Sequence, residues 1–193
     1  IEINYTLDRN HQFTQELGLK FGQYLQFLRG TSSLEANYKI NRANQLFNGI
    51  KQRIQTNNIL LSPQLDWKMG DIQGRYAGIW SWSWTTFKRP DLPSYGHVLN
   101  HNVSLTYDIQ SKVFLTASGT YVEAANANQK NRQTLINSNI RYKASKKVEY
   151  GLQVLNLLNQ KRNSFFLMES GYSFYQENAT RGRMVVLTAQ MNF

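Results

Sequence analysis

Histidine is the residue type that most often supplies a general base or a metal ligand, and the 193-residue sequence contains His11, His97 and His101. His97 and His101 are four residues apart, and on an extended strand this spacing separates two side chains of one face by about 13 Å. Two ligands of one metal ion must lie much closer together than that. The pair therefore predicts no metal site, and we expect both residues in a loop or at the surface end of a strand.

Other catalytic groups are also missing from the sequence. The chain has no cysteine, which excludes thiol nucleophiles and cysteine-ligated metals. No motif places a base beside a serine, as a nucleophile elbow does, and no glycine-rich phosphate loop is present. We therefore predict a protein that is not an enzyme and that has no catalytic residues, no metal and no cofactor.

Trp80, Trp82 and Trp84 alternate with Ser81 and Ser83. On a strand, this spacing places three indoles on one face and two small hydroxyls on the other. Three interpretations fit: the lipid face of a transmembrane barrel, with the outermost ring at the headgroup level, the wall of a soluble core, or a platform for stacking sugar rings. We favour membrane-interface aromatics, because three large rings in a row are difficult to bury in a small sandwich.

The elements that would position these residues are strands, because apolar residues recur with a period of two along almost the whole chain. Ten segments show this alternation, and none has a convincing helical period. The segments are 1–7, 17–21, 34–40, 59–67, 76–84, 103–109, 113–121, 136–142, 148–154 and 185–193.

The connections between these segments are of two kinds. The short ones are 28–32, 69–71, 110–112 and 145–147, and the long ones are 41–56, 88–97, 124–132 and 161–183. From the second segment onward, short and long connections alternate. This pattern is expected of an outer-membrane barrel, in which tight turns face the periplasm and longer loops face the exterior.

Strand length and hydropathy favour a membrane protein built from strands. No stretch approaches the roughly 18 to 20 apolar residues that a spanning helix needs, and the mean hydropathy is −0.52, so a helical membrane protein is excluded. A tilted spanning strand needs about 9 to 11 residues, whereas soluble strands usually have about 5 to 6. Segments 71–87, 112–125 and 182–193 reach the longer length. The sequence therefore predicts an all-β fold, an antiparallel transmembrane β-barrel of about ten strands.

The chain has 22 Lys and Arg against 12 Asp and Glu, a net charge of +10. Basic residues lie at polar-face positions of the expected strands (Lys20, Lys39, Lys68, Arg75, Arg141 and Lys143) and in the expected connections (Lys51, Arg53, Lys88, Arg89, Lys130, Arg132, Lys161 and Arg162). They are dispersed rather than gathered in one stripe with aromatic residues, so we expect no nucleic-acid partner. Three roles stay open: contact with phosphorylated lipid headgroups, an anion-favouring or plug-pairing barrel interior, and solvated charge without a specific role.

The long connections also predict a position for four of these basic residues. We expect Lys88, Arg89, Lys161 and Arg162 near the outer rim of the barrel, at the end opposite Gly70 and Lys146.

The end of the chain resembles a known signature. Phe193 is the last residue, and Met191, Ala189, Leu187 and Val185 precede it at alternate positions. This pattern resembles the terminal strand of bacterial outer-membrane proteins, which their assembly machinery recognises. The resemblance implies that Phe193 and Met191 belong to an assembly signal.

Two nearby motifs are similar to those of TonB-dependent receptors of the Bacteroidetes type. An alternating strand from Tyr150 runs into Asn156, Leu157, Leu158 and Asn159 and then the basic Lys161, as in the penultimate strand of that family. Gly182 and Arg183 are similar to the start of the family's last strand. Leu158 stands where phenylalanine is usual. Together the motifs cover the last quarter of the chain, and the rest contributes barrel-like alternation.

The resemblance implies that residues 1–193 are one transmembrane segment at the C-terminal end of a larger, 22-stranded barrel, with no plug domain present. Its function would be the uptake of a nutrient ligand as an integral protein of the outer membrane of a Gram-negative bacterium. Its partners would be TonB, through a plug that is not in this chain, the barrel assembly machinery, outer-membrane lipid including lipopolysaccharide, and a surface lipoprotein.

Other interpretations remain open. The protein could be a structural or assembly-associated outer-membrane barrel without transport, or a soluble β-sandwich that binds carbohydrate. We expect residues 183–193 to pair with residues 148–158. In a fragment of a larger barrel, which we favour, the other edge of that last strand needs a strand outside this chain. In a complete ten-stranded barrel, residues 1–7 would supply it.

Overall fold

The computed structural model describes residues 2–7, 13–47, 50–86, 95–126, 129–169 and 172–191. Its strands are β1 (Glu2–Leu7), β2 (Phe13–Leu25), β3 (Gly30–Phe47), β4 (Ile50–Met69), β5 (Ile72–Thr86), β6 (Tyr95–Ile109), β7 (Val113–Asn126), β8 (Lys130–Lys143), β9 (Val148–Leu155), β10 (Arg162–Glu169), β11 (Tyr172–Ala179) and β12 (Met184–Met191). A short 3-10 turn, η1 (Gln26–Leu28), joins β2 to β3. No helix in these ranges is both long and apolar enough to cross a membrane.

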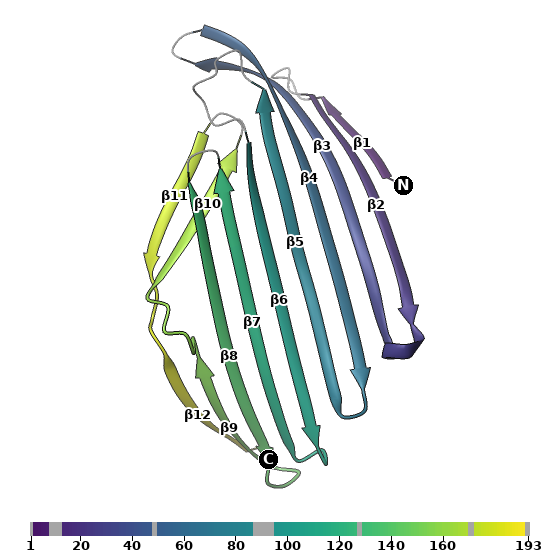
Figure 1. Ribbon diagram of the computed structural model, residues 1–193, viewed down its shortest axis with the longest axis vertical. Helices are drawn as coiled ribbons and strands as arrows, with labels where there is room; N and C mark the ends of the chain where they lie inside the picture. Colours follow the sequence, from purple (N-terminus) through teal and green to yellow (C-terminus); the bar gives the residue numbers. More distant parts are fainter. Residues whose placement is uncertain are drawn as a thin grey trace.

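Ten strands form one antiparallel sheet in the order β1-β2-β3-β4-β5-β6-β7-β8-β9-β12, and β10 and β11 form a separate hairpin (Figure 1). Each of the ten alternating segments of the sequence contributes one strand of the sheet. The prediction of an antiparallel all-β fold is therefore confirmed. The fold follows from the alternation, because side chains of one strand point to opposite faces and the neighbouring strands keep that separation.

Several strands are longer than the sequence predicts. β3 continues to Phe47 and β4 begins at Ile50, so the long connection expected at residues 41–56 is wrong. The connection expected at 124–132 is also wrong, because β7 runs to Asn126 and β8 starts at Lys130. Polar residues continue these strands because the ladder of backbone hydrogen bonds does not require apolar side chains.

The expected connection at 161–183 is another correction. It contains the hairpin of β10 and β11, which pair from Arg162↔Ala179 to Glu169↔Tyr172. The connection expected at 88–97 lies mostly outside the described residues, and β6 begins within it at Tyr95.

The four short connections lie at one end of the sheet, as the alternation of loop lengths predicts (Figure 1). Three of these turns contain residues with positive φ: Arg29 at 45°, Gly70 at 59°, and Gln110 at 52° with Ser111 at 56°. We call this end the turn end.

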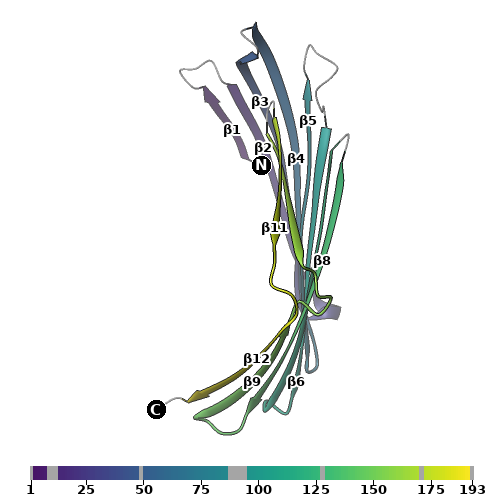
Figure 2. The same ribbon diagram turned by 90° about the vertical axis from the view of Figure 1, so that its left-hand side faces the viewer.

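The sheet is strongly curved but open. Figure 2 shows the curvature, with β10 and β11 on the concave side. β12 pairs with β9 from Met184↔Leu155 to Met191↔Val148, as predicted. Within the described residues β1 pairs with β2 alone and β12 with β9 alone, so the expected closure into a barrel is not observed. Each outermost strand keeps one edge without a partner strand in this part of the chain.

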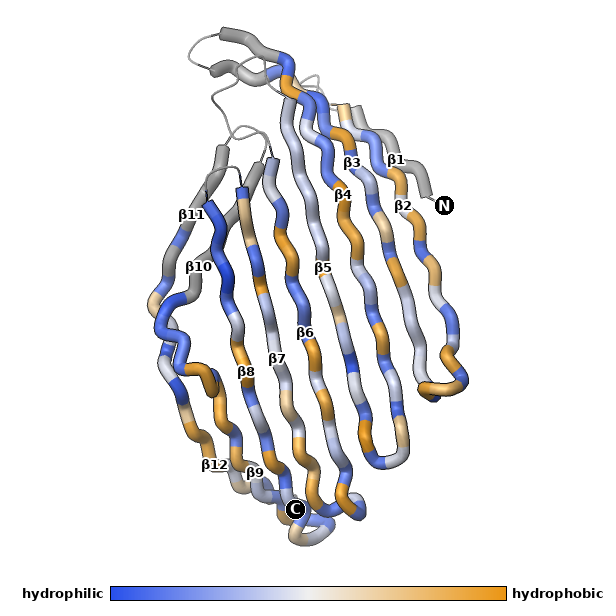
Figure 3. The backbone as a smooth tube through the Cα atoms, in the orientation of Figure 1, coloured by the Kyte–Doolittle hydropathy of each residue, from blue (hydrophilic) through white to orange (hydrophobic). Residues whose placement is uncertain are grey.

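The two faces of the sheet differ in chemistry, and Figure 3 shows the alternation along β3 to β8. Residues paired across strands point to the same side, so each face can be followed from strand to strand. We call the face that carries Trp80 the apolar face and the opposite one the polar face. In the described part, all exposed large hydrophobic side chains lie on the apolar face except Tyr24, Phe27, Ile79 and Leu158.

Candidate functional site

The apolar face carries a band of hydrophobic residues that starts at the turn end. On β6 the band includes Ile109, Tyr107, Leu105, Val103 and Leu99. From Ile109 to Leu99 the strand advances by about ten residues, or about 34 Å. At the usual barrel tilt of about 35–45°, this length corresponds to a band about 26 Å high, close to the about 25 Å of a transmembrane barrel.

A cluster of polar side chains lies on the same face at the upper edge of this band. Glu123 of β7 is at its centre, because the carboxylate accepts hydrogen bonds from Tyr121 Oη at 2.8 Å and Arg132 Nε at 2.8 Å. Lys130 Nζ lies 2.8 Å from the other carboxylate oxygen, and His97 Nε2 lies 3.2 Å from it. We call these five residues the Glu123 cluster.

The register positions the members of the Glu123 cluster side by side. Glu123 pairs with Arg132 across β7 and β8 and with Leu99 across β6 and β7, so the three side chains share one row. The Glu123 side chain is 9% exposed, whereas those of Lys130 and Arg132 are 47% and 61% exposed. The carboxylate is therefore covered, and the two cations form the outer surface of the cluster.

Sequence reasoning missed this cluster because it placed residues 124–132 in a connection. Lys130 and Arg132 belong to β8, so their expected place in a loop is wrong. Two signals were present in the sequence. Glu123 follows Tyr121 in the apolar parity of β7, and Arg132 has the parity of Ile136 and Ile140 on β8. A carboxylate at an apolar position needs cationic partners. Lys130 and Arg132 follow it in the sequence, on the next strand of the same hairpin.

Aromatic rings surround His101 just below the cluster. Tyr76 Oη and His101 Nδ1 are 2.9 Å apart, and the rings of Trp80 and Tyr121 lie 5.8 Å and 6.0 Å from the imidazole. His101 lies inside β6, so its expected position in a loop or at a strand end is wrong, while His97 lies near the start of the strand. In the described part of the chain, no group of three or more acidic or histidine side chains could hold a metal ion.

Trp80, Trp82 and Trp84 all lie on the apolar face, through their pairing with Leu61, Ile59 and Asn57. The side chain of Trp84 is 36% exposed and stacks on Tyr38 with ring centres 6.4 Å apart. The fourth tryptophan, Trp67, shares this face nearer to the turn end.

The family-like motifs at the end of the chain meet in space. Asn156 has a positive φ of 54° and is only 8% exposed. Its Nδ2 donates to the carbonyl oxygens of Gln160 at 2.7 Å and Arg181 at 3.0 Å, and its Oδ1 accepts from the backbone N–H of Gln160 at 2.9 Å. This residue therefore closes a tight turn after β9 and ties it to the segment before β12.

Arg183 joins the same two segments from the other side. Its guanidinium donates twice to the carbonyl oxygen of Leu157, from Nε at 3.0 Å and from Nη2 at 2.6 Å. Its backbone N–H donates to Oδ1 of Asn159 at 3.0 Å. Gly182 lies against the same amide, and a Cβ atom there would come within 2.7 Å of Asn159 Oδ1. We call residues 156–160 and 180–183 the β9–β12 junction.

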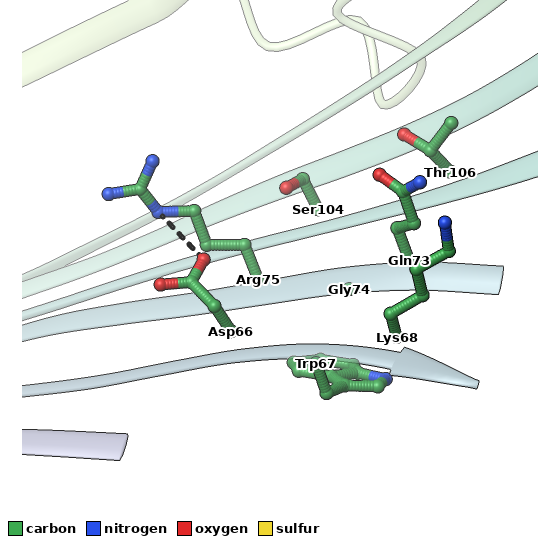
Figure 4. Close-up of a pocket in the computed structure, with 8 residues that line it drawn as sticks. All are labelled: Asp66, Trp67, Lys68, Gln73, Gly74, Arg75, Ser104 and Thr106. Carbon is green, nitrogen blue, oxygen red and sulfur yellow. Dashed lines mark ion pairs between the residues drawn. The ribbon is translucent and has the colours of Figure 1, made fainter. Parts of the chain in front are cut away.

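The polar face holds a shallow pocket near the turn end (Figure 4). Asp66, Lys68, Gln73, Arg75, Ser104 and Thr106 line it from β4, β5 and β6. Arg75 Nε lies 3.5 Å from Asp66 Oδ1, but both side chains are at least half exposed. In Figure 4 these polar side chains point toward the side where the pale C-terminal strands lie, which is the concave side, while the indole of Trp67 lies on the other side of the strands.

The remaining predicted residues have varied positions. Lys20, Lys39, Lys68, Arg75, Arg141 and Lys143 all occupy the polar face, as expected. Lys161 precedes β10 and Arg162 begins it. After β9 the N–H of Leu157 bonds to the carbonyl oxygen of Ile136, in the middle of β8. The chain therefore leaves β9 in the middle of the sheet, and not near the outer rim where we expected these two residues. Met191 is 65% exposed on the apolar face. Phe193, His11, Lys88 and Arg89 lie outside the described residues.

Comparison of the chain with protein-family models, with curated protein sequences and with solved structures found no match. Functional assignment therefore rests on the chemistry of the two faces and on the C-terminal motifs.

Proposed function

We propose that the chain is part of the wall of a transmembrane β-barrel in a Gram-negative outer membrane, in a receptor of the TonB-dependent type that takes up a nutrient ligand. The observation that carries the proposal is the exposed apolar face. On this face a hydrophobic band of transmembrane height lies between the turn end and the Glu123 cluster.

A water-soluble protein of this size would bury most of its large hydrophobic side chains. Among the described residues the buried hydrophobic ones are two alanines, Ala124 and Ala125, and one isoleucine, Ile54. In contrast, Phe21, Leu187 and Val185 are each more than 60% exposed. Monomeric soluble proteins rarely expose a contiguous apolar patch above a few hundred Å². Lipid acyl chains would cover this face, and this favours a barrel over the soluble carbohydrate-binding module.

The unpartnered edges support a barrel larger than this sheet. In lipid, each unpaired backbone N–H or C=O group costs several kcal/mol, so a spanning sheet must close. Further strands beside β1 and β12 would complete the wall, with the polar face toward the interior. The β9–β12 junction fits this proposal, because it fixes the last strand beside β9 with hydrogen bonds from Asn156 and Arg183.

The orientation follows from the connections. The turn end would face the periplasm, because outer-membrane barrels have short periplasmic turns. The Glu123 cluster and the tryptophans at the upper edge of the band would then lie at the outer leaflet, where aromatic girdles are found.

The test is the depth of single tryptophans in lipid vesicles. The full-length protein is prepared in versions that keep only Trp80 or only Trp84, the other tryptophans being replaced by phenylalanine. These two residues are four apart on β5, or about 10 Å in depth after strand tilt. Trp80 pairs with Leu99 at the upper edge of the band and Trp84 lies beyond it, so acyl chains brominated near the headgroup should quench Trp80 more strongly than Trp84, and aqueous acrylamide should quench Trp84 more strongly than Trp80.

Equal quenching of both residues by aqueous acrylamide, with none by brominated lipid, would refute the membrane proposal. Transport is tested separately: deletion of the gene should abolish growth on the ligand while outer-membrane integrity is unchanged. A loss of integrity without a loss of uptake would instead favour a structural barrel.

A further inference from the structure

The Glu123 cluster presents its positive charge outward. Its carboxylate is 9% exposed, and Lys130 and Arg132 cover it with side chains that are about half or more exposed. Two cations and one carboxylate leave an excess of one positive charge at the surface. Arg132 lies in the row of Leu99, where the hydrophobic band ends, and Lys130 lies in the next row above it.

Both cations have donors to spare. The bond from Arg132 to Glu123 uses Nε, which leaves the two terminal amino groups of the guanidinium for another acceptor. Lys130 approaches Glu123 with an ammonium group that has three donors. Phosphate oxygens are strong acceptors for such a pair, and guanidinium binds phosphate with two parallel hydrogen bonds.

We propose that Lys130 and Arg132, held in place by Glu123, bind the phosphate of an anionic lipid headgroup at the outer edge of the bilayer. This inference rests on the proposed membrane function and names a partner for its lipid face. The headgroup phosphate would sit on the cations, and its acyl chains would run down the band along β6 and β7. Position on the apolar face selects a lipid over a free anion, because a soluble anion gains nothing from the band below.

Charge and position both fit this occupant. Basic residues near a membrane surface are attracted to anionic lipid, by about 1 kcal/mol each, and these two cations lie where the hydrophobic band ends. Glu123 keeps the two long side chains in fixed positions, so less conformational entropy is lost when the phosphate binds. Tyr121 donates to the carboxylate from the side of the band, and His97 contacts it from the opposite side, in the row of Lys130.

The experiment measures lipid binding to the full-length protein in a neutral detergent by native mass spectrometry. The probes are lipid A with both phosphates, the same lipid without phosphate, and inorganic phosphate as a competitor. The variant is K130Q/R132Q. The matched control is K146Q/K147Q, which removes the same charge from the exposed turn between β8 and β9 at the turn end.

The expected result is that K130Q/R132Q weakens binding of phosphorylated lipid A by about 10- to 30-fold. The control K146Q/K147Q should bind this lipid about as tightly as the wild type does. The lipid without phosphate should bind the wild type and both variants with similar affinity. Equal weakening in both variants would overturn the site in favour of unspecific charge. Displacement of lipid A by millimolar inorganic phosphate would show an ion site rather than a lipid site.

Removal of both cations leaves Glu123 covered and without its charged partners, so K130Q/R132Q could fail to fold. The triple variant E123Q/K130Q/R132Q avoids this, and K146Q is then the control with the same change in net charge. Undiminished lipid A binding by a folded triple variant overturns the inference. The membrane proposal fails by a different result, the absence of quenching by brominated lipid.

Discussion

Replacement of Asn156 by alanine tests the β9–β12 junction most directly. The Asn156 amide makes three hydrogen bonds, two to the carbonyl oxygens of Gln160 and Arg181 and one from the N–H of Gln160. The residue is 8% exposed, so water cannot readily replace the lost partners. The change N156A should therefore weaken the connection between β9 and β12 without touching the rest of the sheet.

The magnitude follows from two contributions. Three hydrogen bonds at about 1 kcal/mol each give about 3 kcal/mol. The positive φ of 54° suits asparagine, and alanine in this left-handed conformation costs about 1 kcal/mol more. We therefore expect N156A to lower the free energy of unfolding by about 4 kcal/mol. N156G, which tolerates the positive φ, should lower it by about 3 kcal/mol.

Asn159 is the matched control in the same turn. Its φ is 55°, but it is exposed, and its side chain accepts one hydrogen bond, from the N–H of Arg183. N159A therefore combines the same backbone strain with one lost bond, and we expect a loss of about 2 kcal/mol.

The assay is urea unfolding of each variant in lipid vesicles, followed by tryptophan fluorescence, with the free energy taken from the linear extrapolation. Losses for N156A and N159A that differ by less than about 1 kcal/mol would refute the reasoning, because the buried hydrogen bonds are what separates them. So would an N156G variant as stable as the wild type.

Three further predictions concern other parts of the sheet. The change G74A should lower stability by about 1–3 kcal/mol, because its Cβ would overlap the indole of Trp67, and the same change in a W67L background should cost much less. E123Q should lower the urea midpoint more than E149Q, because Glu123 has four partners at 3.2 Å or less while Glu149 has an ion pair at 3.5 Å; equal midpoints would contradict the role of the cluster. Deletion of Phe193 should reduce the amount of protein assembled in the outer membrane, measured by fractionation, and normal insertion with lost ligand binding would contradict an assembly signal.

The period of the hydrophobic residues was sufficient to predict the ten strands of the sheet and their antiparallel order. Alternation determines which side chains share a face, and each face then determines the register of its neighbours. Dependence on this alternation also explains why the prediction placed the ends of several strands in connections. Beyond the hydrophobic band both faces become polar, as at Arg42 and Gln55, whose side chains are joined by a 2.9 Å hydrogen bond across β3 and β4. Pairing continues there, but the alternation that revealed it has ended.

The candidate site was harder to predict for the same reason. The Glu123 cluster lies where the band ends, so His97, Lys130 and Arg132 look like residues of connections in the sequence, although Tyr121 and Glu123 lie in an expected strand. The two C-terminal motifs were found, but not their contact, because the hairpin of β10 and β11 separates Asn156 from Arg181 by a stretch of chain that shows no periodicity. Long-range hydrogen bonds of this kind depend on the path of the chain and not on its local pattern.

The distribution of charge bears on the roles that the net charge of +10 left open. On the polar face of β2–β9 and β12 the described basic residues are Lys20, Lys39, Lys68, Arg75, Arg141 and Lys143, and the acidic ones are Glu16, Glu35, Asp66, Asp108 and Glu149. The two sets nearly cancel, and three cross-strand pairs join them at 3.5–3.9 Å. This face therefore produces little net field to favour anions in a barrel interior. The excess positive charge belongs to the rest of the chain, and where the hydrophobic band ends on β7 and β8 it is Lys130 and Arg132 that supply it, which is where a phosphorylated headgroup would meet the wall.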